Sequence, residues 1–162
     1  MFRAMRRFKQ QLTDEECIEI LKNSTSGVLA VSGENGYPYA VPMSFVYTDG
    51  KIYFHSAVTG HKVDAVKNNP LVSFCVTAKD DVSPAEFTTY YKSVIVFGKA
   101  RILTDEKEII SSIRTLSDKY SFDYREKRDK EISGSMGRFC IIELNIEHMT
   151  GKQAKELLKA DR

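Results

Sequence analysis

The sequence predicts a mainly β protein of the α+β class: an antiparallel sheet of six strands, closed into a small barrel, with helices packed outside. Six short apolar segments and two tight-turn signals, Asn35-Gly36 and Asp49-Gly50, carry this prediction. The turns join the first three strands, which lie too close in the chain for crossover helices and therefore run antiparallel. A meander that begins with two hairpins favours a barrel over a sandwich.

The six strands are expected where apolar or alternating residues lie between turn signals. They cover residues 27–32, 37–47, 51–56, 71–78, 90–103 and 137–146. Pro42 lies inside the second strand, which indicates an edge strand, a bulge or a ligand-facing break in the ladder. The polar segment 79–86 is expected to be a loop.

Helices are expected in four places between and after these strands. They begin at residues 13, 60, 104 and 150, and the last ends near Leu158. Thr13 and Glu16 form a capping-box pattern at the first helix, and Pro70 ends the second because the residue before proline disfavours helical angles. The charged segment 121–135 is expected to be mobile or dependent on a partner.

Length and composition favour one ordinary globular domain over residues 1–162. The net charge of +2 is too small to argue for nucleic acid, although residues 1–12 form a basic tail. No apolar run approaches the ~20 residues of a membrane span, and no secretory signal is recognisable. Three scattered cysteines without metal-type spacing point to reduced thiols and to a cytoplasmic protein without a bound metal.

The segment around the second helix suggests a phosphate site. The helix begins at Gly60 and carries His61 and Lys62 in its first turn. The first N–H groups of a helix lack intrahelical partners, and the helix dipole makes this end positive, so a phosphate fits there. The alternative interpretation is an amphipathic surface helix with a Thr59 cap and a solvated lysine.

Six segments occur in a characteristic order along the chain: residues 36–47, 49–57, 60–62, 69–74, 93–100 and 147–152. Together they resemble the flavin-binding split-barrel proteins related to pyridoxamine 5'-phosphate oxidase. Within that superfamily the chain is most similar to the Nim-type branch, which is linked to 5-nitroimidazole resistance.

The resemblance implies a homodimeric split barrel with FMN at the subunit interface, or a deazaflavin, which related split barrels also bind. The second strand would lie along the flavin ring through Val41, Pro42, Met43 and Ser44. The ribityl and phosphate region would meet His55, Ser56 and Ala57. His61 and Lys62 stand where the oxidase has Arg-Lys, and Tyr91 and Ser93 would approach from the neighbouring subunit.

The implied function is that of an FMN-dependent oxidoreductase acting on a small molecule, with nitro compounds as a candidate substrate class. His55 would be a substrate-side proton donor. Residues 138–144 lack the arginine and histidine cluster with which the oxidase holds its vitamin substrate, which argues against vitamin B6 oxidation. Two alternatives stay open. One is a non-catalytic flavin- or haem-binding module, with His55, His61 or His148 as axial ligand. The other is a nucleic-acid or phosphoprotein partner that uses the basic tail.

Overall fold

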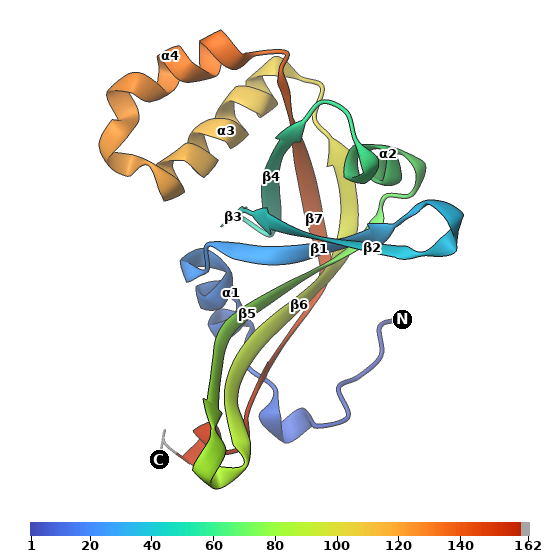
Figure 1. Ribbon diagram of the computed structural model, residues 1–162, viewed down its shortest axis with the longest axis vertical. Coiled ribbons are helices and arrows are strands. Elements are labelled where there is room, and N and C mark those ends of the chain that lie inside the picture. Colours follow the sequence, from blue (N-terminus) through green and yellow to red (C-terminus); the bar gives the residue numbers. More distant parts are fainter. Residues whose placement is uncertain (160–162) are drawn as a thin grey trace.

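The strands form a single antiparallel sheet, as the hairpin signals predicted. The computed structural model describes residues 1–159 (Figure 1). The strands are β1 (Ser26–Ser32), β2 (Pro38–Ser44), β3 (Val46–Thr48), β4 (Lys51–Ala57), β5 (Leu71–Ser83), β6 (Thr88–Ile102) and β7 (Phe139–Gln153). Their order across the sheet is β2-β1-β5-β6-β7-β4-β3. The mainly β, α+β class is therefore confirmed, and Pro42 lies on an edge strand, which was one of its three expected settings.

The prediction of six strands in a closed barrel is not confirmed. The sheet has seven strands, and no backbone ladder closes it within the described part of the chain. The difference arises at Phe45, which divides the expected strand 37–47 into β2 and β3. These two strands lie at opposite edges of the sheet although a single residue separates them, so the sheet has to curve strongly to bring its edges together. In Figure 1 the β1–β2 hairpin accordingly runs across the long strands β5, β6 and β7.

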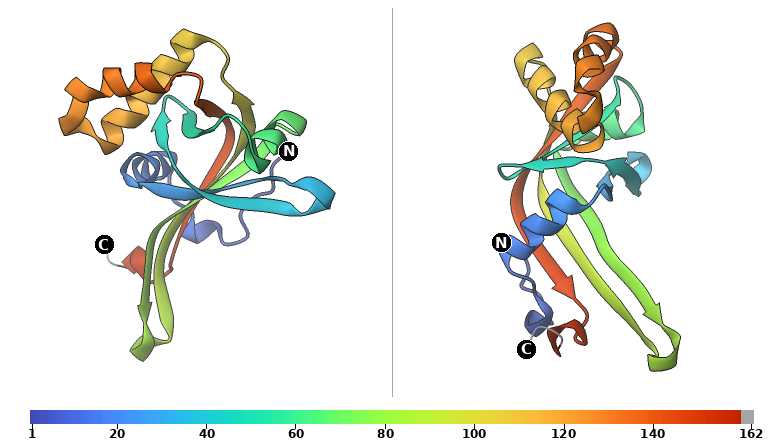
Figure 2. Two further views of the ribbon diagram at one scale, coloured as in Figure 1. Left: turned by 45° about the horizontal axis from the view of Figure 1, so that its top comes forward. Right: turned by 90° about the vertical axis from the view of Figure 1, so that its left-hand side faces the viewer.

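Two segments are strand where the sequence suggested otherwise. Residues 79–83, expected in a loop, pair with residues 88–92, and only η3 (Pro84–Glu86) forms the turn. The helix expected from Thr150 does not begin there, because residues 150–153 continue β7 along β6, and only the short 3-10 helix η5 (Leu157–Lys159) follows. A long neighbouring strand supplies ladder partners that outweigh local turn and cap signals. Figure 2 shows the resulting β5–β6 hairpin projecting away from the helices at the other end of the molecule.

The helices cover the sheet from several sides. They are α1 (Asp14–Asn23), α2 (His61–Asn68), α3 (Glu106–Tyr120) and α4 (Arg125–Ser135). The capping box of α1 is present: the Thr13 N–H donates to Glu16 Oε2 at 2.7 Å, and the Glu16 N–H donates to Thr13 Oγ1 at 3.2 Å. No helix among residues 1–159 is long and apolar enough to cross a membrane.

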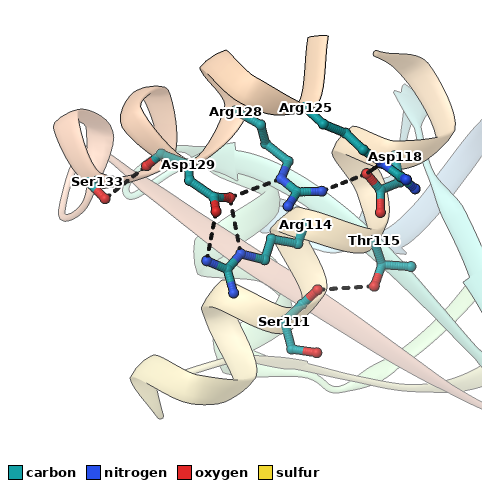
Figure 3. Close-up of polar contacts among 8 residues, drawn as sticks. All are labelled: Ser111, Arg114, Thr115, Asp118, Arg125, Arg128, Asp129 and Ser133. Atoms are coloured by element: carbon teal, nitrogen blue, oxygen red, sulfur yellow. Dashed lines mark hydrogen bonds and ion pairs between the residues drawn. The ribbon is translucent and has the colours of Figure 1, made fainter. Parts of the chain in front are cut away.

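The segment expected to be mobile contains helix α4, preceded by η4 (Phe122–Tyr124). Ion pairs join α4 to α3: Arg114 contacts Asp129 at 3.1 Å, and Arg128 contacts Asp118 at 2.6 Å (Figure 3). Ile132 is the buried residue of α4. The charged face thus belongs to a helical hairpin, and the mobility of this segment stays a prediction.

The core consists of two apolar clusters. The larger lies between the curved sheet, α1 and α2; Phe74 meets Phe45 and Phe54 there with ring centroids 4.8 and 5.0 Å apart. The smaller lies beneath α3 and α4 and includes Ile132. The basic tail is partly docked, since Leu12 is buried in the larger cluster and Phe2 stacks on His148.

Candidate functional site

Two free strand edges approach each other beside α2. β4 pairs with β7 along its whole length, but β3 covers its other edge only at Lys51–Tyr53, so the segment 55–57 is unpaired there. β2 pairs with β1 alone and touches β4 without pairing to it. Unpaired edges present backbone N–H and C=O groups that need partners. The place where the edges of β2 and β4 approach, called the gap below, therefore offers backbone groups that a ligand with polar edges could satisfy.

On β2, which forms one wall of the gap, the four predicted contacts of the flavin ring lie on two opposite faces of the strand. Val41 and Met43 are half-buried and pack against the larger core cluster. Pro42 and Ser44 are exposed on the opposite face, because successive strand residues alternate. Val41 and Met43 therefore lie on the inner, core-facing side of β2, whereas Pro42 and Ser44 lie on the outer surface of the sheet.

The β4 wall carries a buried hydroxyl without a partner. Ser56 is 5% exposed, and its Oγ makes no hydrogen bond within residues 1–159. Cys140, its cross-strand neighbour on β7, donates to the Ala57 carbonyl at 3.2 Å. Burial raises the pKa of the Cys140 thiol, and the positive charges of Lys62 and Lys67 oppose that shift. A buried hydroxyl without a partner among residues 1–159 is a ready contact for a polar ligand.

His55 and Ala57 face away from Ser56 on the other side of β4. Both residues are exposed, and the His55 ring meets Phe139 edge-on with centroids 6.3 Å apart. The predicted proton donor and the buried hydroxyl therefore lie on opposite faces of one strand. A single ligand reaches both only by passing around the free edge of β4.

Helix α2 begins at this gap. Gly60 is its N-cap residue with φ of 126°, a conformation that favours glycine, and no side chain caps the helix. The cap is therefore not Thr59. The N–H groups of Val63 and Asp64 bond to the Gly60 carbonyl, while those of His61 and Lys62 have no backbone partner in the described chain. The helix start thus offers two N–H donors with a lysine beside them, which suits a phosphate.

An unpredicted residue, Tyr39, connects the helix to the β2 wall. The His61 ring stacks on Tyr39 with centroids 4.1 Å apart and planes 20° apart. Tyr39 lies on the same face of β2 as Val41 and Met43. The alternation through residues 39, 41 and 43 was the sequence signal that could have identified it. The imidazole of His61 therefore lies against β2, although the residue is exposed to solvent.

Tyr91 and Ser93 lie far from this gap in the same chain. Ser93 pairs with Lys152, and the Lys152 ammonium lies 5.3 Å from the centre of the Tyr91 ring. His55 pairs with Ile141 on the same strand, β7. Eleven positions, or about 36 Å of strand, separate Ile141 from Lys152. One protomer therefore does not bring these two residues to the gap.

The residues of the gap fit a flavin mononucleotide. The α2 start with Lys62 suits the phosphate, the orphaned Ser56 hydroxyl suits the ribityl chain, and the half-buried Val41 and Met43 offer apolar surface to the ring. Among residues 1–159, no cluster of three or more histidine, cysteine, aspartate or glutamate side chains could hold a metal ion.

Comparison with known proteins gives the family. The model of the pyridoxamine 5'-phosphate oxidase family matches residues 13–153, and the chain belongs to that family. The resemblance inferred from the ordered motifs is therefore confirmed. A comparison with curated proteins gave no significant match.

Several solved structures share the fold. A candidate 5-nitroimidazole antibiotic resistance protein from Bacteroides thetaiotaomicron has a TM-score of 0.76 at 19% identity, over 88% of this chain and 86% of its own. The flavocytochrome Anf3 from Azotobacter vinelandii has a TM-score of 0.76 at 20% identity, over 94% and 72%. A FAD-binding protein from Mesorhizobium loti has a TM-score of 0.61 at 25% identity, over 90% and 97%.

Proposed function

We propose that this protein binds FMN in the gap between β2 and β4. The observation that carries the proposal is the meeting of two unpaired strand edges at the uncapped start of α2, beside the orphaned hydroxyl of Ser56. Lys62 and the first N–H groups of α2 would hold the phosphate. Ser56 would bond the ribityl chain, and Val41 and Met43 would face the ring. Relatives whose names state that they bind a flavin support this assignment.

The chemistry that follows is oxidoreduction of a small molecule. A bound flavin supplies hydride or electron transfer, so the protein chiefly has to bind, orient and exclude water. His55 is exposed at the free edge of β4, where its imidazole can give a proton to a substrate that lies against the flavin. The solved structure named for 5-nitroimidazole resistance supports nitro compounds as the substrate class.

We further propose that the working unit is a homodimer in which Tyr91 and Ser93 reach the flavin of the partner. Supporting this, the outer face of the sheet exposes apolar side chains in adjacent strands: Val28 is 39% exposed, Leu71 57%, Ile95 41% and Phe97 38%. Burial of such a face is the usual driving force for association. A second copy would also bring the distant β6 residues within reach of a gap that they cannot reach in their own chain.

The test is an absorption scan of the purified protein, followed by mass identification of any released cofactor. Flavin bands near ~375 and ~450 nm are expected, and the mass distinguishes FMN from a deazaflavin. Replacement of His61 and Lys62 by alanine should lower flavin occupancy, because it removes the phosphate charge partner.

Lys67→Ala is the matched control for that variant. Lys67 is an exposed lysine in the last turn of the same helix, away from the N–H donors, so its loss should leave occupancy unchanged. Equal occupancy in the wild type and the double variant would reject the phosphate site. A colourless protein that takes up no added FMN would reject the proposed function altogether.

A haem-binding module is the second candidate. His148 stacks on Phe2 with centroids 4.5 Å apart, and Phe2 and Phe97 line an apolar groove of about 710 Å³ on the outer face of the sheet. An imidazole beside an apolar cavity is a reasonable axial ligand. A Soret band that His148→Ala removes and His55→Ala keeps would favour this candidate.

A further inference from the structure

At the break between β2 and β3, a side chain from a distant helix forms hydrogen bonds with the backbone. Phe45 lies at the break, is completely buried, and has no ladder partner on either strand. The hydroxyl of Tyr120, at the end of α3, accepts a hydrogen bond from the Phe45 N–H at 2.9 Å. Its oxygen also lies 2.8 Å from the Phe45 carbonyl and within hydrogen-bond distance of the Thr25 carbonyl.

The Tyr120 hydroxyl supplies the hydrogen bonds that a neighbouring strand would otherwise give to the backbone of Phe45. In a hydrogen-bonded pair of an antiparallel ladder, a residue bonds with both its N–H and its C=O to the one residue opposite. The Tyr120 hydroxyl offers an acceptor and a donor at one point, so it serves both backbone groups of Phe45. Its single hydrogen is shared between the carbonyls of Phe45 and Thr25. The strand can therefore leave one edge of the sheet and join the other without exposing or orphaning these buried groups.

The end of α3 is also fastened to α1. Lys119, next to Tyr120, donates to the carbonyls of Leu21 and Ser24 at the end of α1. Its ammonium lies 4.2 Å from the centre of the Phe45 ring. A cation on the last carbonyls of a helix is favourable because the helix dipole is negative there. The position of Tyr120 is consequently fixed both by its own hydrogen bonds and by the contacts of the neighbouring Lys119 with α1.

We propose that Tyr120 is a positioning residue for the flavin site, which it serves by holding the β2 wall at the correct place. The inference rests on the proposed function. Met43 lies two residues before Phe45, and β2 is bonded on one side only, to β1. The fixed point at Phe45 therefore determines where the free edge of β2 lies relative to β4. Tyr120 acts through Phe45 and does not itself touch the cofactor.

Tyr120→Phe is the direct test, because it deletes one oxygen and keeps the ring. We expect the Kd for added FMN to rise by up to roughly tenfold, because the energy of the lost bond to Phe45 no longer holds the β2 wall in place, and the visible circular dichroism of the bound flavin to change. Amide hydrogen exchange at Phe45 should accelerate, because its N–H loses its acceptor.

Two controls separate positioning from general destabilisation. Leu116→Ala loosens the packing of the same helix but keeps the hydroxyl, so it should lower Tm and leave the flavin Kd and spectrum unchanged. Tyr124→Phe removes a hydroxyl from an exposed residue just after α3 and should change nothing. Equal flavin Kd and equal spectra in Tyr120→Phe and the wild type would overturn the inference, as would the same flavin effect in Leu116→Ala.

Failure of the positioning role can be distinguished from failure of the proposed function. If the wild type takes up no flavin, both the proposed function and the positioning role are wrong, and the exchange rate at Phe45 then reports only on the backbone contact. If the wild type binds FMN and Tyr120→Phe binds it equally well, only the positioning role is wrong.

Discussion

At the residue scale, the site depends on polar groups that have no hydrogen-bond partner among residues 1–159. The Ser56 hydroxyl and the first N–H groups of α2 all point to hydrogen bonds that a ligand would complete. His61 differs, because its ring already stacks on Tyr39. Lys62, whose ammonium forms no ion pair with the residues that the structure describes, is therefore expected to contribute more to phosphate binding than His61.

Ser56→Ala tests the orphaned hydroxyl. The hydroxyl makes no hydrogen bond within the described residues, so its removal should leave Tm unchanged or slightly higher. The Kd for FMN should rise roughly three- to tenfold, because the ribityl chain loses one hydrogen bond. Titration calorimetry with FMN and a thermal melt of the apoprotein measure the two effects. A lower Tm with unchanged affinity would contradict the ligand role of Ser56.

At the scale of elements, one buried carboxylate joins three strands to α3. Glu143 on β7 is 5% exposed and accepts from Arg101 Nε at 2.7 Å, Lys51 Nζ at 3.0 Å and the Tyr53 hydroxyl at 3.1 Å. Arg101 also bonds Glu108 of α3 at 2.7 Å. Burial raises the pKa of Glu143, but these three hydrogen bonds outweigh it and hold the pKa below the usual range.

The network makes stability dependent on pH. A carboxyl whose folded pKa is depressed contributes stability above its unfolded pKa, and this contribution is lost as the pH falls through the folded value. Glu143→Gln should lower the free energy of unfolding at pH 7 by about 1–3 kcal/mol and flatten the loss of stability below the unfolded pKa of about 4.3. Urea melts at several pH values measure this. Parallel pH curves for the variant and the wild type would contradict the expectation.

At the scale of the whole molecule, the fold separates the proposed cofactor gap from the β5–β6 hairpin. Tyr91 and Ser93 lie on that hairpin, and the apolar outer face lies between them and α2. A single chain therefore holds the proposed cofactor gap at one place and Tyr91 and Ser93 at another. A symmetric pair of chains would join each gap to the partner's β6.

Ile95→Asp tests this arrangement. A charge at the centre of the apolar outer face should prevent association, because an unpaired carboxylate is costly to bury. Light scattering coupled to gel filtration should give the monomer mass of about 18.4 kDa for the variant and twice that for the wild type. Phe122→Asp, on the exposed η4 turn, is the control and should stay dimeric. A wild-type protein of monomer mass would reject the homodimer.

The sequence alone determined the features that depend on neighbours in the chain. The Asn35-Gly36 and Asp49-Gly50 turns, the Thr13–Glu16 capping box and the stop before Pro70 are all present in the structure. The family was also accessible, because its motifs are contiguous segments in a fixed order. The predicted roles of His55 and Tyr91 and the cytoplasmic location stay predictions.

Only the tertiary structure decided how distant segments meet. The division of the second strand at Phe45 depends on Tyr120, 75 residues away, and the continuation of β7 to Gln153 depends on the length of β6. Likewise, the burial of the Ser56 hydroxyl without a partner depends on how the curved sheet packs around β4. Local sequence encodes turns and caps through short-range hydrogen bonds. Edge closure and buried polar contacts instead arise from long-range packing, which no single segment contains.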